Sequence, residues 1–220
     1  LNKITALEYF GYNCQNYMVN KEHFFKNKNE VGIYCQIPLY NTSINEACEN
    51  WLDILLSSDC GLTDDKIYVL NDQHSWNLFF ESRHSMPDLA LKKTKELDGI
   101  SIITDTIVPP KNFNLFLEKV HCLIKDANIE YLLFGHLGDC HLHFHLIIDK
   151  HQEEEAINVY DKIIDISSSL NGVYSAEHGT GKRKKIDFIK CYGNTAAEQI
   201  RTTKLFFDPN MLLNKGNVIS

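Results

Sequence analysis

A run of alternating histidines near the middle of the chain constrains the fold most. In the stretch FGHLGDCHLHFHL, residues 134–146, histidines at positions 141, 143 and 145 alternate with apolar residues at 142, 144 and 146. Successive side chains of a strand point to opposite faces, so a strand here has one apolar face and one face of imidazoles. The apolar face must be buried, and the imidazoles must meet polar groups. The segment therefore predicts a sheet with its core on one side and a polar site on the other.

Hydrophobic periodicity elsewhere predicts a mixed chain of helices and strands. Helices are predicted over residues 5–20, 44–57, 75–96 and 113–123, around 156–164 and from 196 onward, and strands over 31–40, 66–70, 99–108, 130–134, 141–148 and 172–176. Pro87 must begin a new helix or kink the helix around it, because proline lacks an amide donor. The opening LNKITALEYF reads as a helix already under way at Leu1, which is typical of an excised fragment.

These elements form two similar blocks in which strands and helices alternate. The expected fold class is α+β: a ferredoxin-like, duplicated α/β sandwich in which helices cover an antiparallel sheet. At 220 residues with 44% hydrophobic content, the chain is long enough to bury a substantial core.

Charge and composition exclude several classes of function. With 29 acidic and 22 basic residues the net charge is −7, which argues against nucleic acid as a partner. The basic run at 182–185 is interpreted as a solvated face or an anion-steering patch. No apolar run approaches the ~20 residues that span a bilayer, so a cytoplasmic protein, at most peripheral to an inner membrane, is expected. Seven cysteines without a CxxC pair predict buried thiols and no disulfide scaffold.

The histidine run suggests a metal site. His136 lies across a glycine-marked turn from His143, so a hairpin would bring the two imidazoles together as ligands for zinc, manganese or iron. Glu177, in AEHGTG, offers a carboxylate that completes a two-histidine, one-carboxylate set with open coordination positions. The alternative for an isolated HxH pair is a strand whose histidines simply face solvent.

Two further residues could take part in chemistry. His178 directly follows the predicted carboxylate ligand and could act as a base, or could be a structural histidine. Gly179 and Gly181 allow positive φ at that turn. Arg83, in FFESRHSMPD, could bind a substrate carboxylate bidentately, although an ordinary surface ion pair is the alternative.

Several of these segments resemble one known family. GHLGDCHLHFHL resembles the motif GHxGDGNxH, and YSAEHGTGK resembles SxEHGxG, of the C-terminal domain of FAD-linked oxidases. That family includes D-lactate dehydrogenase, D-2-hydroxyglutarate dehydrogenase and the flavin subunit of glycolate oxidase. Further similarity lies in ITALEYF, WNLFFESRHSMPD, DTIVPP and the closing FDPNMLLNKGN, so the resemblance covers essentially the whole chain.

The resemblance implies a cap domain, residues 1–220, that lies over the flavin of a separate FAD-binding domain expected upstream of Leu1. Its cofactors would be FAD and a divalent metal (Zn, Mn or Fe), and its substrate a 2-hydroxy acid. The roles implied by position are metal ligation by His136, His143 and Glu177, proton acceptance by His178, and substrate contact by Arg83 and by His145, which occupies the place of a substrate-contacting asparagine.

The chain also departs from the family pattern. Cys140 and His141 replace Gly-Asn of the motif, and His145 replaces an asparagine. Ile103 stands where some members carry a substrate-binding lysine, which argues against 2-hydroxyglutarate and favours a small monocarboxylate such as D-lactate or glycolate. The segment EHGTGKRKK and the terminal GN are similar to bacterial members. Without an FAD-binding domain, these 220 residues are predicted to be inactive alone.

Two other functions stay open at this stage. The same two histidines and glutamate could activate water in a stand-alone metallohydrolase, or they could sequester a cation in a non-catalytic metal-binding module. A flavin-binding region of about 200 residues upstream would favour the dehydrogenase. Binding of D-lactate only in the presence of metal would separate the dehydrogenase from the module.

Overall fold

The computed structural model describes residues 4–58 and 60–219. The described strands and α-helices, in chain order, are β1 (Ala6–Phe10), β2 (Gly32–Gln36), α1 (Ile44–Leu56), α2 (Gln73–Glu96), β3 (Ser101–Ile103), α3 (Phe113–Asp126), β4 (Glu130–His136), β5 (His141–Ile147), α4 (Glu153–Ser169) and α5 (Lys185–Phe207).

The strands form one sheet in the order β2-β1-β4-β5-β3, and every neighbouring pair is antiparallel. From β3 onward the elements run β3-α3-β4-β5-α4, which matches a ferredoxin-like unit as far as its last strand. The predicted strand over 172–176 is reduced to two isolated bridges, Asp105 to Ser175 and Ile107 to Val173. The α+β class with an antiparallel sheet is therefore confirmed.

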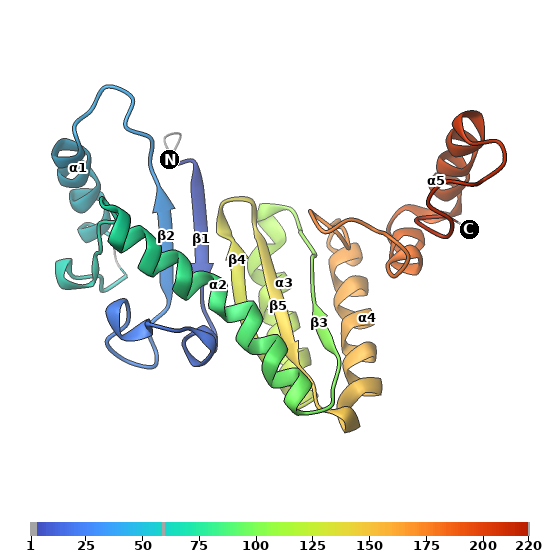
Figure 1. Ribbon diagram of the computed structural model, residues 1–220, viewed down its shortest axis with the longest axis horizontal. Coiled ribbons are helices and arrows are strands. Elements are labelled where there is room, and N and C mark those ends of the chain that lie inside the picture. Colours follow the sequence, from blue (N-terminus) through green and yellow to red (C-terminus); the bar gives the residue numbers. More distant parts are fainter. Residues whose placement is uncertain (1–3, 59, 220) are drawn as a thin grey trace.

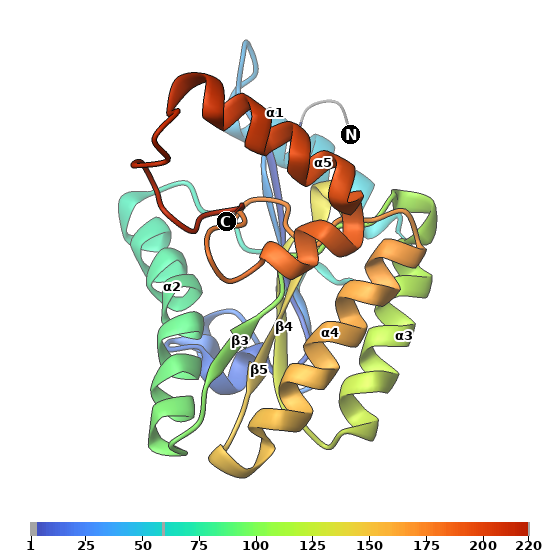
Figure 2. The ribbon, with the colours of Figure 1, turned by 90° about the vertical axis from the view of Figure 1, so that its right-hand side faces the viewer.

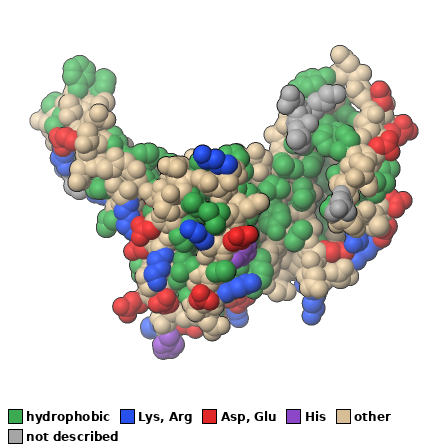
Figure 3. Space-filling view, turned by 180° about the vertical axis from the view of Figure 1, so that it is seen from behind, with side chains coloured by type: hydrophobic (Ala, Val, Ile, Leu, Met, Phe, Trp, Pro, Cys, Tyr) green, Lys and Arg blue, Asp and Glu red, His purple; other side chains and the backbone are tan. Residues whose placement is uncertain are grey.

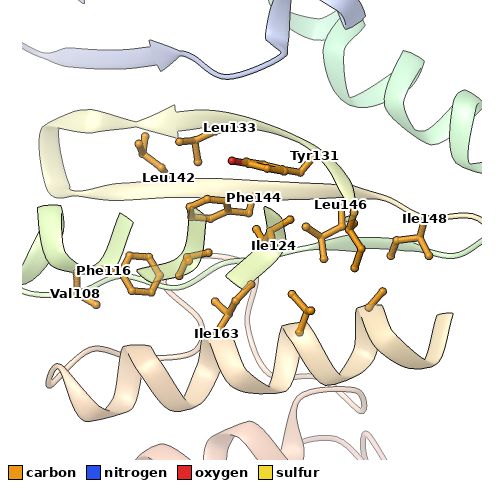
Figure 4. Packing of buried hydrophobic residues seen from close by; sticks show 14 residues of the cluster. Val108, Phe116, Ile124, Tyr131, Leu133, Leu142, Phe144, Leu146, Ile148 and Ile163 are labelled. Carbon is orange, nitrogen blue, oxygen red and sulfur yellow. The ribbon is translucent and has the colours of Figure 1, made fainter. Parts of the chain in front are cut away.

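Helices cover both faces of the sheet. Figure 2 shows the sheet nearly edge-on, with α2 on one side and α3 and α4 on the other. The apolar side chains of β5 pack against α3 and α4 in a core of fully or almost fully buried residues (Figure 4): Val108, Phe116, Val120, Ile124, Ile129, Tyr131, Leu133, Leu142, Phe144, Leu146, Ile148, Ala156, Val159 and Ile163. The odd-numbered residues of β5 therefore lie on the opposite face of the sheet, which α2 covers.

A second core lies between α2 and that opposite face. Met86 and Ala90 of α2 pack with Leu132 of β4 and Ile147 of β5. The helix begins where the Asp72 carboxylate accepts a hydrogen bond from the Ser75 amide at 2.9 Å. It then continues through Pro87 to Glu96, so the proline does not begin a new helix.

Two predicted elements are wrong. The segment predicted as a helix over 5–20 forms β1, followed by 3-10 turns at Cys14–Tyr17 and Lys21–His23. Its backbone pairs with both β2 and β4, and these long-range hydrogen bonds outweigh a local helical pattern. The strand predicted over 66–70 is absent from the described chain, which has a 3-10 turn at Asp64–Lys66 there. The first part of the predicted opening helix, residues 1–3, lies outside the described residues.

Two arms extend from this body. Figure 1 shows α1 at one end of the molecule and the last part of α5 at the other. Seen from behind, the surface is hollowed between the arms, with hydrophobic side chains along the hollow (Figure 3). No residue of α1 is buried, and Phe206 and Phe207 at the end of α5 are largely exposed. Helices thus pack on both faces of the sheet, whereas α1 and the end of α5 are not buried.

Candidate metal and proton-transfer site

The β4–β5 hairpin brings the rings of His136, His141 and His143 together. His136 lies opposite His141, and Phe134 opposite His143, so the His136 and His143 rings are diagonal neighbours with centroids 5.8 Å apart. A glycine is needed at position 135, because a Cβ there would lie 2.9 Å from the carbonyl oxygen of His141 and 3.0 Å from the His143 ring. The predicted hairpin, with His136 beside His143, is therefore confirmed.

Two of these imidazoles are oriented by a partner on one nitrogen. His136 Nδ1 lies 2.8 Å from Glu8 Oε1, and His143 Nδ1 lies 2.9 Å from the Thr104 carbonyl oxygen. Each ring thus donates from Nδ1 to a fixed acceptor, which leaves Nε2 with a lone pair directed away from it. Carboxylate and carbonyl partners of this kind are typical of metal-binding histidines.

The two Nε2 atoms face the same carboxylate oxygen. Glu177 Oε1 lies 3.3 Å from His136 Nε2 and 3.4 Å from His143 Nε2. Metal–ligand bonds of 2.0–2.2 Å put neighbouring ligand atoms roughly 3 to 3.5 Å apart. The observed spacing therefore fits three ligands of one divalent cation, and the three residues predicted as ligands are brought together.

Electrostatics support this arrangement. Burial alone would raise the pKa of the Glu8 carboxyl, but the hydrogen bonds and charges of Arg83 and His136 outweigh it and hold that pKa below its usual range. The pKa of His136 is raised, because its two carboxylate partners, Glu8 and Glu177, overcome the effect of burial. Burial, only partly offset by the Thr104 carbonyl, lowers the pKa of His143. Two carboxylates, those of Glu8 and Glu177, therefore lie against His136, one at each ring nitrogen.

His178 lies beside the three predicted ligands. Its ring stacks on that of His143, with centroids 5.1 Å apart and planes 7° apart, and its Nε2 lies 3.5 Å from Glu177 Oε1. More than a third of its side chain is exposed. An imidazole that is accessible and adjacent to a cation site is well placed to accept a proton from a bound group.

The two predicted substrate contacts lie in different surroundings. Arg83 Nη2 lies 2.9 Å from Glu8 Oε2, so this guanidinium is already paired at the edge of the cluster. His145 is buried, with Nε2 3.1 Å from Ser101 Oγ and with no hydrogen-bond partner for Nδ1. Burial, with a smaller contribution from His143, lowers the pKa of His145 to about 4, so this imidazole is neutral near pH 7. Contact of either residue with substrate stays a prediction.

Sequence reasoning missed three participants. Glu8 was hidden by the incorrect helix over 5–20, whereas in β1 it lies directly opposite His136. Asp105 is a lone acid in the apolar run GISIITDTIVPP, and such an acid needs a buried partner. One partner of Asp105 is Lys184, whose Nζ lies 3.0 Å from Asp105 Oδ2. The interpretation of the basic run as a solvated or anion-steering patch is therefore wrong for this lysine.

Two further expectations concern the chain as a whole. Within residues 4–58 and 60–219 no disulfide joins two cysteines, but only Cys14 is buried, so the prediction of buried thiols is wrong for the other six. Along the part of the chain that the structure describes, every helix is too short or too polar to cross a membrane.

Comparison with known proteins gives the family of this chain. Residues 23–218 match the family model for the C-terminal domain of FAD linked oxidases. The chain is 30% identical over 117 residues to a D-lactate dehydrogenase of Archaeoglobus fulgidus (53% of this chain, 26% of that protein). It is 26% identical over 180 residues to a D-2-hydroxyglutarate dehydrogenase of Haemophilus influenzae (76% of this chain, 17% of that protein). It is 24% identical over 193 residues to the glycolate oxidase subunit GlcD of Escherichia coli K12 (86% of this chain, 37% of that protein).

A solved structure shares the fold. The 4-ethylphenol oxidase from Gulosibacter chungangensis, in its isoeugenol complex, aligns with a TM-score of 0.59 and 11% sequence identity, over 97% of this chain and 47% of that one. The chain spans between about a sixth and two fifths of the length of the three relatives above. The family model, by contrast, matches nearly all of this chain. The chain therefore belongs to the family of C-terminal domains of FAD-linked oxidases.

Proposed function

We propose that this chain is the substrate- and metal-binding domain of an FAD-dependent dehydrogenase that oxidises a small 2-hydroxy acid to the 2-oxo acid. The observation that carries the proposal is the convergence of His136, His143 and Glu177 on one point, with His178 beside it. The names of the relatives support the substrate class, because each denotes an enzyme of D-lactate, D-2-hydroxyglutarate or glycolate.

The residues of this chain would divide the work as follows. His136, His143 and Glu177 would hold a divalent cation, which would supply the positive charge that makes a substrate hydroxyl more acidic. His178 accepts the hydroxyl proton on Nε2. The hydrogen on Cα leaves with its electron pair, and FAD supplies the acceptor for that hydride. Loss of this proton and hydride converts the 2-hydroxy acid to the 2-oxo acid.

Substrate choice depends on the two positions next to the cluster. Ile103 lies directly opposite His145 in the β3–β5 pair, where a lysine would be needed to neutralise a second carboxylate. An isoleucine cannot provide this charge, and His145 is neutral near pH 7. We therefore propose a monocarboxylate of the D-lactate or glycolate type, whose one carboxylate would contact the cation and Arg83.

The flavin would be held by a separate FAD-binding domain, encoded upstream of residue 1. The relatives are several times longer than the stretch they share with this chain, which leaves room for such a domain. The domain boundary at residue 1 and the inactivity of the 220 residues alone are parts of this proposal.

The test uses the longer protein with its flavin, mixed anaerobically with D-lactate, glycolate or D-2-hydroxyglutarate. D-Lactate or glycolate should bleach the flavin absorbance, D-2-hydroxyglutarate should not, and removal of metal by a chelator should abolish the reaction. His178→Gln should slow it by about 10²- to 10⁴-fold, whereas His23→Gln, at an exposed histidine outside the cluster, should not. Hydrolytic activity of the 220 residues alone, with no flavin reduction in the longer protein, would instead favour the metallohydrolase.

A further inference from the structure

Asp105 is a buried acid next to the candidate metal site. It follows β3, is 1% exposed, and lies on the side of the sheet that carries the histidines of β5. A carboxylate this deep must be neutralised or fully hydrogen-bonded. Its partners therefore show what it does in the fold.

The Asp105 carboxylate accepts from groups on three separate segments. Its Oδ1 lies 3.2 Å from the Glu177 amide nitrogen and 3.1 Å from His141 Nε2. Its Oδ2 lies 3.0 Å from the His178 amide nitrogen and 3.0 Å from Lys184 Nζ, and accepts also from the Ser175 hydroxyl. Two oxygens thus receive five donors, one of them a cation.

This saturation excludes Asp105 as a metal ligand. Its ligand atom lies within 4.8 Å of those of His143, Glu177 and His178, so by distance alone the four could hold an ion. A carboxylate has about four lone-pair positions, however, and those of Asp105 are already taken by donors. The hydrogen bonds from His141, Ser175, Lys184 and the Glu177 amide also hold the pKa of Asp105 well below its usual range, despite its burial.

The turn that carries Glu177 and His178 has little rigidity of its own. Gly179 and Gly181 follow with φ of 72° and 55°. Glycine adopts positive φ at lower cost than any other residue, so it restricts the backbone least. The Glu177 side chain is nearly half exposed, so packing does not fix it. At Ala176, Glu177 and His178 the turn is held by Asp105: the Ala176 amide bonds to the Asp105 carbonyl oxygen at 2.8 Å, and the next two amides bond to the Asp105 carboxylate. Farther along, Ser175 Oγ donates to the Gly179 carbonyl oxygen at 3.2 Å.

We propose that Asp105 is a positioning residue that holds the consecutive amides of Glu177 and His178, and through them aims the carboxylate at His136 and His143. Lys184, at the start of α5, neutralises the charge of the buried carboxylate. Because it follows the turn in the chain, its bond to Asp105 also holds the end of the turn next to that carboxylate. His141 ties β5 to it and stands where the family motif has asparagine. This inference rests on the proposed function, because Glu177 is there a metal ligand.

The first arm of the test needs no metal. Hydrogen exchange of the full 220-residue chain should show the amides of Glu177 and His178 protected, and Asp105→Asn should expose both to exchange. Asp208→Asn is the matched control, because Asp208 likewise receives two backbone amides, of Leu212 and Leu213, and the Lys204 amine. It should lose protection at 212–213 and keep it at 177–178. Retained protection in Asp105→Asn would overturn the proposal.

The second arm titrates the same proteins with Co²⁺ and follows its visible absorption. Asp105→Asn should weaken Co²⁺ binding about 10- to 100-fold and give the absorption spectrum of Glu177→Gln. The double variant should bind no more weakly than Glu177→Gln alone, because Asp105 acts through Glu177. Additive losses, or an equal loss in Asp208→Asn, would overturn the positioning role.

A further variant guards against unfolding. Asp105→Asn/Lys184→Met removes the buried carboxylate charge together with the charge of its lysine partner and avoids leaving that lysine unpaired; it should reproduce the exchange and the Co²⁺ result. If the parent chain binds no Co²⁺, the proposed function fails, while the exchange arm still decides whether Asp105 fixes the turn.

Discussion

The two faces of β5 are equally buried but are stabilised in different ways. Residues 142, 144 and 146 on one face and 141, 143 and 145 on the other are all at most 5% exposed. The first set is held by packing against α3 and α4. The second is held by hydrogen bonds to Asp105, the Thr104 carbonyl and Ser101. Burial alone therefore does not mark a residue as core: the apolar face provides stability, and the polar face holds reactive groups in place.

The largest effect on stability is expected on the apolar face. Phe144→Ala should lower the free energy of unfolding by about 3–5 kcal/mol, because it removes a fully buried ring that packs on Phe116 and Tyr131. Urea titration measures this. Phe206→Ala, at a ring that is 81% exposed, should change it by less than about 0.5 kcal/mol. A small loss in Phe144→Ala would mean that this face is not the main core.

A smaller effect, measured on metal affinity, is expected across the sheet. Glu8→Gln removes the charged partner of His136 Nδ1 and should weaken divalent-metal binding about 10- to 100-fold. Isothermal titration with Zn²⁺ measures the change, and Glu22→Gln, at an exposed acid, is the control. Equal Zn²⁺ affinities in the parent and in Glu8→Gln would show that Glu8 does not contribute to metal binding.

The smallest expected effect is on the pH dependence of stability, which should differ between the two faces of the sheet. Burial, with the nearby charge of Lys125, lowers the pKa of His121, which contacts Phe144 on the apolar side. Its contribution to stability is therefore present above its ordinary pKa of about 6.5 and is lost as pH falls toward the lower folded value. For His136, whose pKa is raised, the contribution is present below about 6.5 and is lost as pH rises through the folded value.

Thermal unfolding between pH 7 and 5 checks this difference. His121→Gln should make stability fall less on acidification than in the parent, and His136→Gln should make it fall more. The same response in both variants would contradict the assignment.

The sequence predicted the hairpin, with His136 beside His143, because both depend on local spacing. Glu177 lies 41 residues from His136 and was added from its own motif, not from local spacing. The alternation of β5 and the glycine at 135 specify strand, turn and facing side within a dozen residues. Glu8 could not be predicted, because its segment has a helical pattern that only pairing with β2 and β4 overrides. Asp105 and Lys184 meet across 79 residues, and no local pattern encodes that contact.

The most direct test of the central claim is the metal stoichiometry of the purified 220-residue chain, measured by elemental analysis after saturation and desalting. The account predicts close to one divalent ion per chain in the parent and a large loss in His143→Ala, since two remaining protein ligands make a poor site. His151→Ala, at a histidine of the turn before α4, should retain the metal of the parent. An unchanged metal content in His143→Ala, or no metal in the parent, would contradict the account.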